Sequence, residues 1–116
     1  MMNVFIDIDE TIATRPFFVE TEGAYNYAHA VPIEENIEKA NELYEEGHQI
    51  TYWTGRGAYS DEDWRKVTKN QLDEWGCKYH ELQVGVPKPW DVVIDNTALN
   101  VKEWTNDRVK NQFNDD

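Results

Sequence analysis

Short apolar runs of strand character alternate along this chain with longer segments whose apolar residues recur at helical spacing. Four runs have strand character: residues 3–8, 49–53, 81–84 and 90–95. Two segments have helical spacing and are followed by a glycine: residues 33–46 and 60–75. Strands and helices that alternate in this way form one sheet with parallel strands and right-handed crossovers. We therefore predict a three-layer α/β/α fold of Rossmann-like type, with a mostly parallel sheet.

The ends of the predicted helices carry further signals. Pro32 precedes the first helix, and Gly47 follows it at a position that favours left-handed backbone. Ser60 and Asp63 resemble a capping box with Asp in place of the usual Glu, so we expect the second helix to begin near them. The inner face of this helix is expected to be apolar, with Trp64, Val67, Leu72 and Trp75. Nearer the C-terminus, the apolar residues fit helical spacing only loosely; they are Val101, Trp104, Val109 and Phe113.

Length and charge limit the kinds of protein that this chain can be. Its 116 residues suit a single domain over residues 1–116, and 23 acidic against 11 basic side chains give a net charge of −12. Such a charge opposes binding to nucleic acid or anionic membranes, and no run approaches the roughly 20 apolar residues of a membrane span. The single cysteine, Cys77, excludes an internal disulfide and a zinc site of several thiolates. We expect a cytoplasmic protein with no nucleic-acid or membrane partner.

Polar side chains follow the predicted strands at the points where these strands end. Asp7 and Asp9 close the first apolar run, which we expect to be buried on both faces of the sheet. The others are Thr54 after the second strand, Lys88 in the loop before the last strand, and Asp95 at the end of that strand. In open α/β sheets, ligands bind outside the carboxyl ends of the strands, so these five residues form the candidate site.

Three carboxylates held close together need a positive counter-ion. Two of them about 4 Å apart repel each other by roughly 4 kcal/mol at an effective dielectric of about 20. Oxygen ligands without nearby His or Cys indicate a hard cation, and two or three carboxylates with open positions suit Mg²⁺ better than Ca²⁺. The sequence therefore predicts Mg²⁺ at the cluster of Asp7, Asp9 and Asp95.

The segment Asp7-Ile8-Asp9-Glu10-Thr11 resembles the D-x-D-x-T signature of phosphatases of the haloacid dehalogenase superfamily. Three later residues match the order that this family uses: Thr54, Lys88 and Asp95. The resemblance spans residues 3 to about 96 and is greatest to the small members that lack a cap domain. It implies a Mg²⁺-dependent phosphomonoester hydrolase that acts on a small phosphorylated metabolite, a sugar phosphate or a nucleotide.

The resemblance also implies a role for each matched carboxylate. Asp7 is the expected nucleophile, which forms an aspartyl-phosphate intermediate. Asp9 is the expected general acid and base, which protonates the leaving oxygen and then takes a proton from water. The side chains of Asp7 and Asp95 and the backbone carbonyl of Asp9 are expected to ligate Mg²⁺.

The other matched residues are expected to bind the phosphoryl group. Thr54 would donate a hydrogen bond to one of its oxygens, and Lys88 would spread positive charge over it. Gly55 and Arg56, which follow Thr54 in the same loop, are further expected substrate contacts. A local excess of positive charge is needed there because the whole chain repels a phosphate dianion.

Two positions depart from the family pattern, and one segment is unusually long. Asn96 follows Asp95 where the family often has a second carboxylate, and Glu10 replaces a residue that is often small. Residues 12–31 form a link of roughly 20 residues, which is long for a compact domain and too short for a cap domain. We expect this link to cover the site as a flap or to pack its aromatic residues into the core. An uncapped site also favours cover from a second subunit, so a homo-oligomer is a further hypothesis.

Two alternative functions stay open. A phospho-acceptor domain resembling bacterial response-regulator receivers also gathers acids, a Thr and a Lys at strand ends. In such a domain the phosphorylated Asp follows a middle strand, whereas the acid pair here, Asp7 and Asp9, follows the first. A degenerate phosphate- or metal-binding domain without turnover is the second alternative, because Asn96 replaces a carboxylate.

Overall fold

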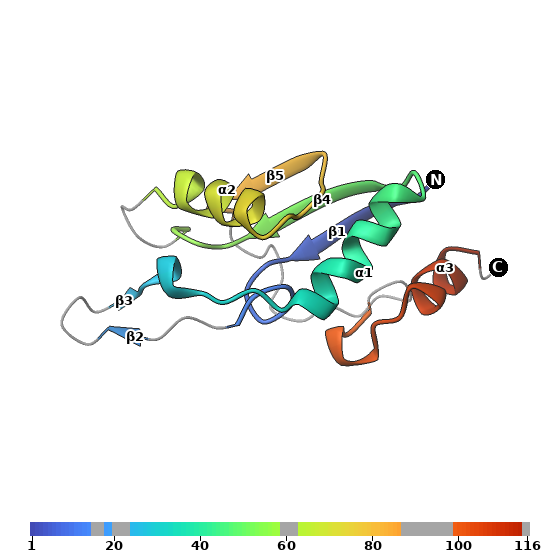
Figure 1. Ribbon diagram of the computed structural model, residues 1–116, viewed down its shortest axis with the longest axis horizontal. Coiled ribbons are helices and arrows are strands. Elements are labelled where there is room, and N and C mark those ends of the chain that lie inside the picture. The colour runs from blue at the N-terminus through green and yellow to red at the C-terminus, as the bar shows by residue number, and fades with distance from the viewer. Residues whose placement is uncertain (15–17, 20–23, 59–62, 87–98, 115–116) are drawn as a thin grey trace.

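In the part of the chain that the structure describes, three parallel strands form the larger of two sheets; the structure is a computed structural model (Figure 1). They are β1 (Asn3–Asp7), β4 (Gln49–Thr54) and β5 (Glu81–Val84), in the order β1-β4-β5. The structure describes residues 1–14, 18–19, 24–58, 63–86 and 99–114. The predicted parallel α/β arrangement is confirmed for these three strands. The fourth expected strand, at residues 90–95, lies outside the described residues.

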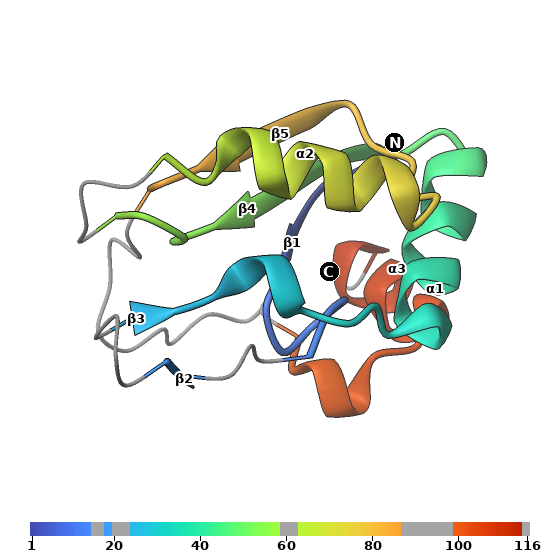
Figure 2. The same cartoon turned by 60° about the vertical axis from the view of Figure 1, so that its left-hand side comes forward.

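Two helices connect these strands and cover one face of the sheet. α1 (Glu34–Glu45) joins β1 to β4, and α2 (Arg65–Glu74) joins β4 to β5. Both connections advance across the sheet in the same direction, and right-handed connections of this kind place their helices on the same face (Figure 2). Their inner residues, among them Leu43 and Leu72, are fully buried in one hydrophobic core with the strands.

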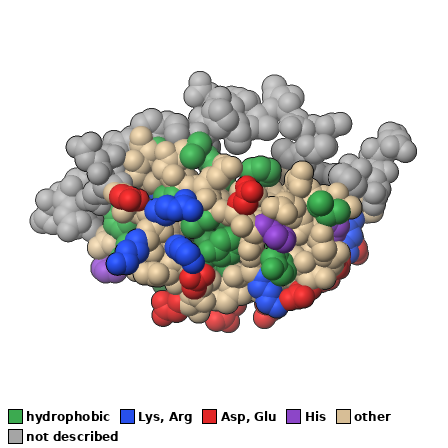
Figure 3. All heavy atoms as spheres, turned by 90° about the horizontal axis from the view of Figure 1, so that it is seen from above, with side chains coloured by type: hydrophobic (Ala, Val, Ile, Leu, Met, Phe, Trp, Pro, Cys, Tyr) green, Lys and Arg blue, Asp and Glu red, His purple; other side chains and the backbone are tan. Residues whose placement is uncertain are grey.

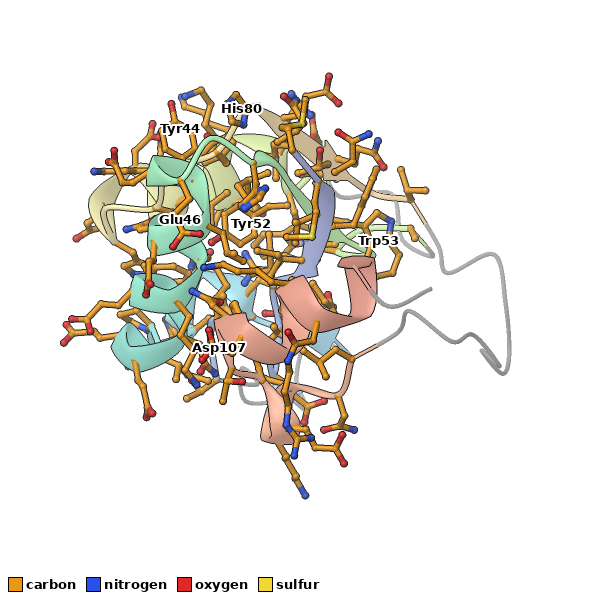
Figure 4. All side chains as sticks on the ribbon, turned by 90° about the vertical axis from the view of Figure 1, so that its right-hand side faces the viewer. Tyr44, Glu46, Tyr52, Trp53, His80 and Asp107 are labelled. Atoms are coloured by element: carbon orange, nitrogen blue, oxygen red, sulfur yellow. The ribbon has the colours of Figure 1, made fainter. Side chains whose placement is uncertain are left out.

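Alternate residues of the strands point to opposite faces of the sheet. Ile50 and Tyr52 are fully buried beneath the helices, whereas Trp53 points to the other face, as Figure 4 shows for the two aromatic side chains. On that second face Phe5 is 64% exposed. The expectation that β1 is buried on both faces is therefore wrong at Phe5, because both crossover helices lie on the opposite side.

The expected boundary signals hold for α1 but not for α2. Gly47 follows α1 with a φ of 94°, as predicted, and its N–H and that of His48 bond to carbonyls of the last turn. α2 begins only at Arg65, so the expected start near Ser60 and Asp63 is wrong. Asp63 Oδ1 instead accepts the backbone N–H of Arg65 at 3.0 Å and so satisfies a donor of the first turn. Ser60 lies outside the described residues.

The long link between β1 and α1 contains short elements of its own. β2 (Phe18–Val19) and β3 (Ala24–Tyr25) pair antiparallel, and a 3₁₀ turn, η1 (Tyr27–His29), follows them. In Figure 1 the hairpin lies on the side toward which the three parallel strands point, away from both chain termini. η1 packs against α2. The segment expected to form a flap is thus anchored beside the carboxyl ends of the sheet.

The C-terminal part forms two short helical elements beside α1. They are η2 (Val101–Glu103) and α3 (Asn106–Asn114), where the sequence fitted a helix only loosely. Lys39 of α1 accepts a hydrogen bond from Nδ2 of Asn106 at its carbonyl, at 2.9 Å, and its Nζ donates to the Trp104 carbonyl at 3.1 Å. Trp104 is buried and closes this end of the core. In the described ranges, neither α3 nor any other helix is long and apolar enough to cross a membrane.

Candidate functional site

Asp7 and Thr54 end neighbouring strands at the same edge of the sheet. Asp7 pairs in register with Trp53, so Thr54 extends one residue beyond it on β4. Neighbouring strands lie about 4.8 Å apart, which brings the two backbones side by side. Asp7 is half-buried, and its Oδ1 accepts the backbone N–H of Ile8 at 2.8 Å. The structure thus brings two of the predicted site residues to one edge.

A tight turn follows β1 and sets the position of Asp9. The Ile8 carbonyl accepts three backbone N–H groups at 2.9 to 3.2 Å, from Thr11, Ile12 and Ala13. Glu10 has a φ of 68°, in the left-handed region that costs about 1 to 2 kcal/mol for a residue with a side chain. Ile12 and Ala13 have no exposed surface. Their burial anchors the turn in the core and holds Asp9 at the edge of the sheet.

Asp9 forms a two-point ion pair with Arg56, which lies in the loop after β4. Nη2 of Arg56 is 2.7 Å from Oδ1 of Asp9, and Nε is 3.0 Å from Oδ2. The Arg56 side chain has no exposed surface, whereas that of Asp9 is 22% exposed. Paired bonds between a guanidinium and a carboxylate fix the relative orientation of both groups. Asp9 is therefore oriented from inside the protein while part of it faces the surface.

Further donors of Arg56 bind side chains of α2. Nη1 donates to Oγ1 of Thr68 at 3.1 Å and to Oε1 of Gln71 at 2.5 Å. The Cζ atom lies 4.9 Å from the centre of the Tyr27 ring, and Nε2 of Gln71 donates to the Tyr27 carbonyl at 2.7 Å. We expected Arg56 to contact the substrate. Its guanidinium lies instead in the interior, where Asp9 and α2 engage it.

Thr68, Gln71 and Tyr27 are neighbours of the site that the sequence pattern did not indicate. We expected an apolar inner face on α2, whereas Thr68 and Gln71 are buried there beside Leu72. Their oxygens are stable in the interior because they accept hydrogen bonds from Arg56. Helical spacing is the signal that could have found them, since Thr68 and Gln71 lie three residues apart and share a face with Leu72.

Thr54 is buried and supports the loop that carries Arg56. It is 1% exposed, and its Oγ1 accepts the backbone N–H of Arg56 at 3.2 Å. Its carbonyl accepts the N–H of Gly85 at 3.1 Å, which joins the loops that follow β4 and β5. A Cβ on Gly55 would lie 3.7 Å from the Val86 carbonyl oxygen, an ordinary contact. The Thr54 hydroxyl keeps its own hydrogen as a donor while it accepts from Arg56.

The other two predicted members of the site, Lys88 and Asp95, lie outside the described residues. Within the described part of the chain, no group of three or more His, Cys, Asp or Glu side chains could hold a metal ion. At the carboxyl ends of β1 and β4, the oxygen donors among the described residues include the Asp7 carboxylate and backbone carbonyls. Both carboxylate oxygens of Asp9 accept hydrogen bonds from Arg56. Oxygen donors fit a hard cation such as Mg²⁺, which takes few protein ligands and keeps several waters.

Basic side chains gather on α2 beside this edge, as the space-filling view shows (Figure 3). Arg65, Lys66 and Lys69 are exposed on this helix, and Lys69 is paired with Asp73 at 3.1 Å. Nη1 of Arg65 donates to the Leu82 carbonyl of β5 at 3.1 Å, which holds this cation against the sheet. Exposed acidic side chains, Asp73 among them, lie on the same helix, so this surface carries charges of both signs.

Comparison with known proteins supports the fold. No family model matches the chain, and no curated protein matches it. The crystal structure of an MCSG target from Vibrio cholerae is similar to it, with a TM-score of 0.73 at 20% sequence identity and 98% of each chain covered. At 20% sequence identity this similarity shows a shared α/β fold alone, and the two proteins share it over nearly the whole of both chains.

Proposed function

We propose that this protein is a Mg²⁺-dependent phosphomonoester hydrolase that acts through an aspartyl-phosphate on Asp7. The observation that carries the proposal is the arrangement at the carboxyl end of β1. Asp7 ends this strand beside the end of β4, and Asp9 follows two residues later in a fixed orientation on Arg56. Two carboxylates with different surroundings are suited to different roles in one reaction.

Asp7 is the nucleophile of the first step. One of its carboxylate oxygens bonds to phosphorus while the bond from phosphorus to the ester oxygen breaks, and Asp9 donates a proton to that oxygen. In the second step a water oxygen attacks phosphorus and Asp9 takes a proton from it. The acyl-phosphate bond then breaks, which releases phosphate and restores Asp7. An Asp9 oxygen that accepts from Arg56 retains a second lone pair, which can carry the proton that Asp9 donates in the first step and regains from water in the second.

Positive partners must balance the charge of the phosphoryl group. We assign this role to Lys88 and to the hydroxyl of Thr54. Mg²⁺, when bound, would neutralise phosphoryl charge, and its proposed ligands are the side chains of Asp7 and Asp95 and the carbonyl of Asp9. In the described part of the chain, the carbonyl of Asp9 accepts none of the backbone hydrogen bonds that form the turn after β1. This supports its assignment as a ligand of Mg²⁺.

The D-x-D-x-T resemblance extends the proposal to the haloacid dehalogenase superfamily, with a three-layer α/β/α fold and no cap domain. The backbone at Glu10 supports this resemblance. Its φ of 68° is a conformation that glycine adopts without strain, which agrees with the small residue that the family often has there.

The proposed substrate is a small phosphorylated metabolite, a sugar phosphate or a nucleotide. The hairpin of β2 and β3 lies on the side of the strand ends and is the proposed flap within residues 12–31. Gly55 would approach the substrate through its backbone. The cytoplasm is the proposed compartment, and a second copy of the chain is the proposed source of any further cover.

Replacement of Asp7 tests the proposal. Asp7→Asn removes the nucleophilic charge and keeps the size of the side chain, so Mg²⁺-dependent hydrolysis of p-nitrophenyl phosphate should fall to background. Asp73→Asn makes the same change on an exposed residue of α2 and should leave turnover unchanged. EDTA should abolish the wild-type reaction, and added Mg²⁺ should restore it.

Other outcomes would refute the assignment. Equal turnover by the wild type and Asp7→Asn would exclude Asp7 as the nucleophile. A phosphoprotein that persists for minutes without turnover would identify a phospho-acceptor domain. Mg²⁺ binding with no turnover on a panel of phosphate esters would identify a binding domain.

A further inference from the structure

Arg56 is a charged residue whose side chain is wholly buried. Burial of an ion is unfavourable unless partners inside the protein replace the water that it loses. Here Nε, Nη1 and Nη2 all donate to side-chain oxygens, and the guanidinium also lies over an aromatic ring. The protein thus provides partners for each of the three nitrogens of this cation.

The partners of Arg56 differ in how much of them reaches the surface. Thr68 has no exposed surface and Gln71 is 8% exposed, whereas the side chain of Asp9 is 22% exposed. Both α2 residues bind the same nitrogen, Nη1, and so prevent the guanidinium plane from turning. The opposite edge of that plane faces Asp9 with two bonds. The network is therefore rigid in the interior and opens to solvent at the Asp9 carboxylate.

We infer that Arg56 is a positioning residue, which holds the Asp9 carboxylate in the orientation for proton transfer and does not itself bind the substrate. This inference rests on the proposed function, in which Asp9 is the general acid. A fork of two bonds fixes both the position and the plane of a carboxylate, which a single contact cannot do. Lysine in place of Arg56 would keep the charge and lose the fork.

The same network reaches the end of the link that follows β1. Tyr27 of η1 lies over the guanidinium, and its carbonyl accepts the hydrogen bond from Gln71. The Tyr27 ring also packs edge-on against Trp64, with ring centres 5.1 Å apart. The segment that carries the proposed flap is thus fastened to the group that orients Asp9.

Leaving groups of different basicity test the role of Arg56. Nitrophenolate leaves without a proton, whereas an alkoxide needs one, so only the alkyl ester depends on the general acid. For Arg56→Lys, kcat/KM should fall by about 10- to 100-fold with an alkyl phosphate and by less than about 3-fold with p-nitrophenyl phosphate. Thr68→Val leaves Asp9 and Arg56 in place and removes one bond to Nη1, so it should give a smaller loss of the same selectivity. Arg108→Lys makes the same substitution on an exposed residue of α3 and should change neither value.

Each further outcome separates this inference from the proposed function. If the wild type hydrolyses both esters while Arg56→Lys loses activity equally on both and has a raised KM, Arg56 binds the substrate. This result would overturn the positioning role but not the proposed function. If the activity of Arg56→Lys falls equally on both esters and in proportion to the fraction of unfolded protein, the role of Arg56 is purely structural. This result would also overturn the positioning role. A wild-type protein that hydrolyses neither ester would overturn the proposed function, and the role of Arg56 with it.

Discussion

Replacement of Arg56 by methionine should destabilise the fold by a large part of its total stability. Methionine fills a similar volume with an apolar chain but offers no donor. Three groups then lose partners: the carboxylate of Asp9, the hydroxyl of Thr68 and the amide oxygen of Gln71. Two of these groups lie in the interior, where an unpaired polar atom has no access to water.

The magnitude follows from the burial of each partner. Loss of one member of a buried ion pair costs about 3 to 5 kcal/mol, and each lost bond to a charged donor about 1.5 to 3 kcal/mol. Water can reach Asp9, whose side chain is 22% exposed, and this lowers the first cost. The two bonds lost in the interior alone account for about 3 to 6 kcal/mol, so we expect Arg56→Met to lower the free energy of unfolding by at least about 3 kcal/mol, against a total of about 5 to 15 kcal/mol for a domain.

Urea unfolding followed by circular dichroism, with Asp9→Asn as the second arm of a double-mutant cycle, measures this effect. If the ion pair is the source, Asp9→Asn should cost less in the Arg56→Met background than in the wild type. The difference should be about 1 to 3 kcal/mol, with an unchanged slope of free energy against urea. A loss below about 1 kcal/mol for Arg56→Met, or strictly additive losses, would refute the reasoning from burial.

Two further predictions concern parts of the fold away from the site. Burial raises the pKa of the Cys77 thiol from 9.0 to about 11, so between these values the unfolded chain binds fewer protons than the folded one. The free energy of unfolding should therefore fall from pH 9 to 11 by up to about 3 kcal/mol, and urea titrations of Cys77→Ala should show a shallower decline; an equal decline would exclude the thiol as its source. Gly47→Ala should lower the free energy of unfolding by about 1 kcal/mol, because its φ is 94° while the space around its Cβ position is open. Gly47→Asn should cost less in the same urea assay, and the reverse order would contradict a backbone origin.

Much of the fold could be predicted because its signals are local. The apolar runs that become β1, β4 and β5 were visible in the sequence, and so was the helical spacing of α1 up to Gly47. The meeting of Asp7 and Thr54 at one edge also followed, because the carboxyl ends of neighbouring parallel strands share an edge. The first residue of α2 could not be predicted from the sequence. Ser60 and Asp63 have the pattern of a capping box, but the helix begins at Arg65, whose backbone N–H bonds to Asp63.

The surroundings of each side chain were decided only by the tertiary structure. Phe5 belongs to an apolar run, yet it is exposed because both crossover helices pack on the other face of the sheet. Asp9 and Arg56 are 47 residues apart and belong to different loops, so nothing next to either one in the sequence indicates the pair. A periodic pattern depends on residues a few positions apart, whereas the burial of a charge depends on which distant surfaces fold around it. For this reason the sequence indicated that Asp7 and Thr54 lie at strand ends, and only the packing of α2 and η1 determined that Arg56 turns inward to Asp9.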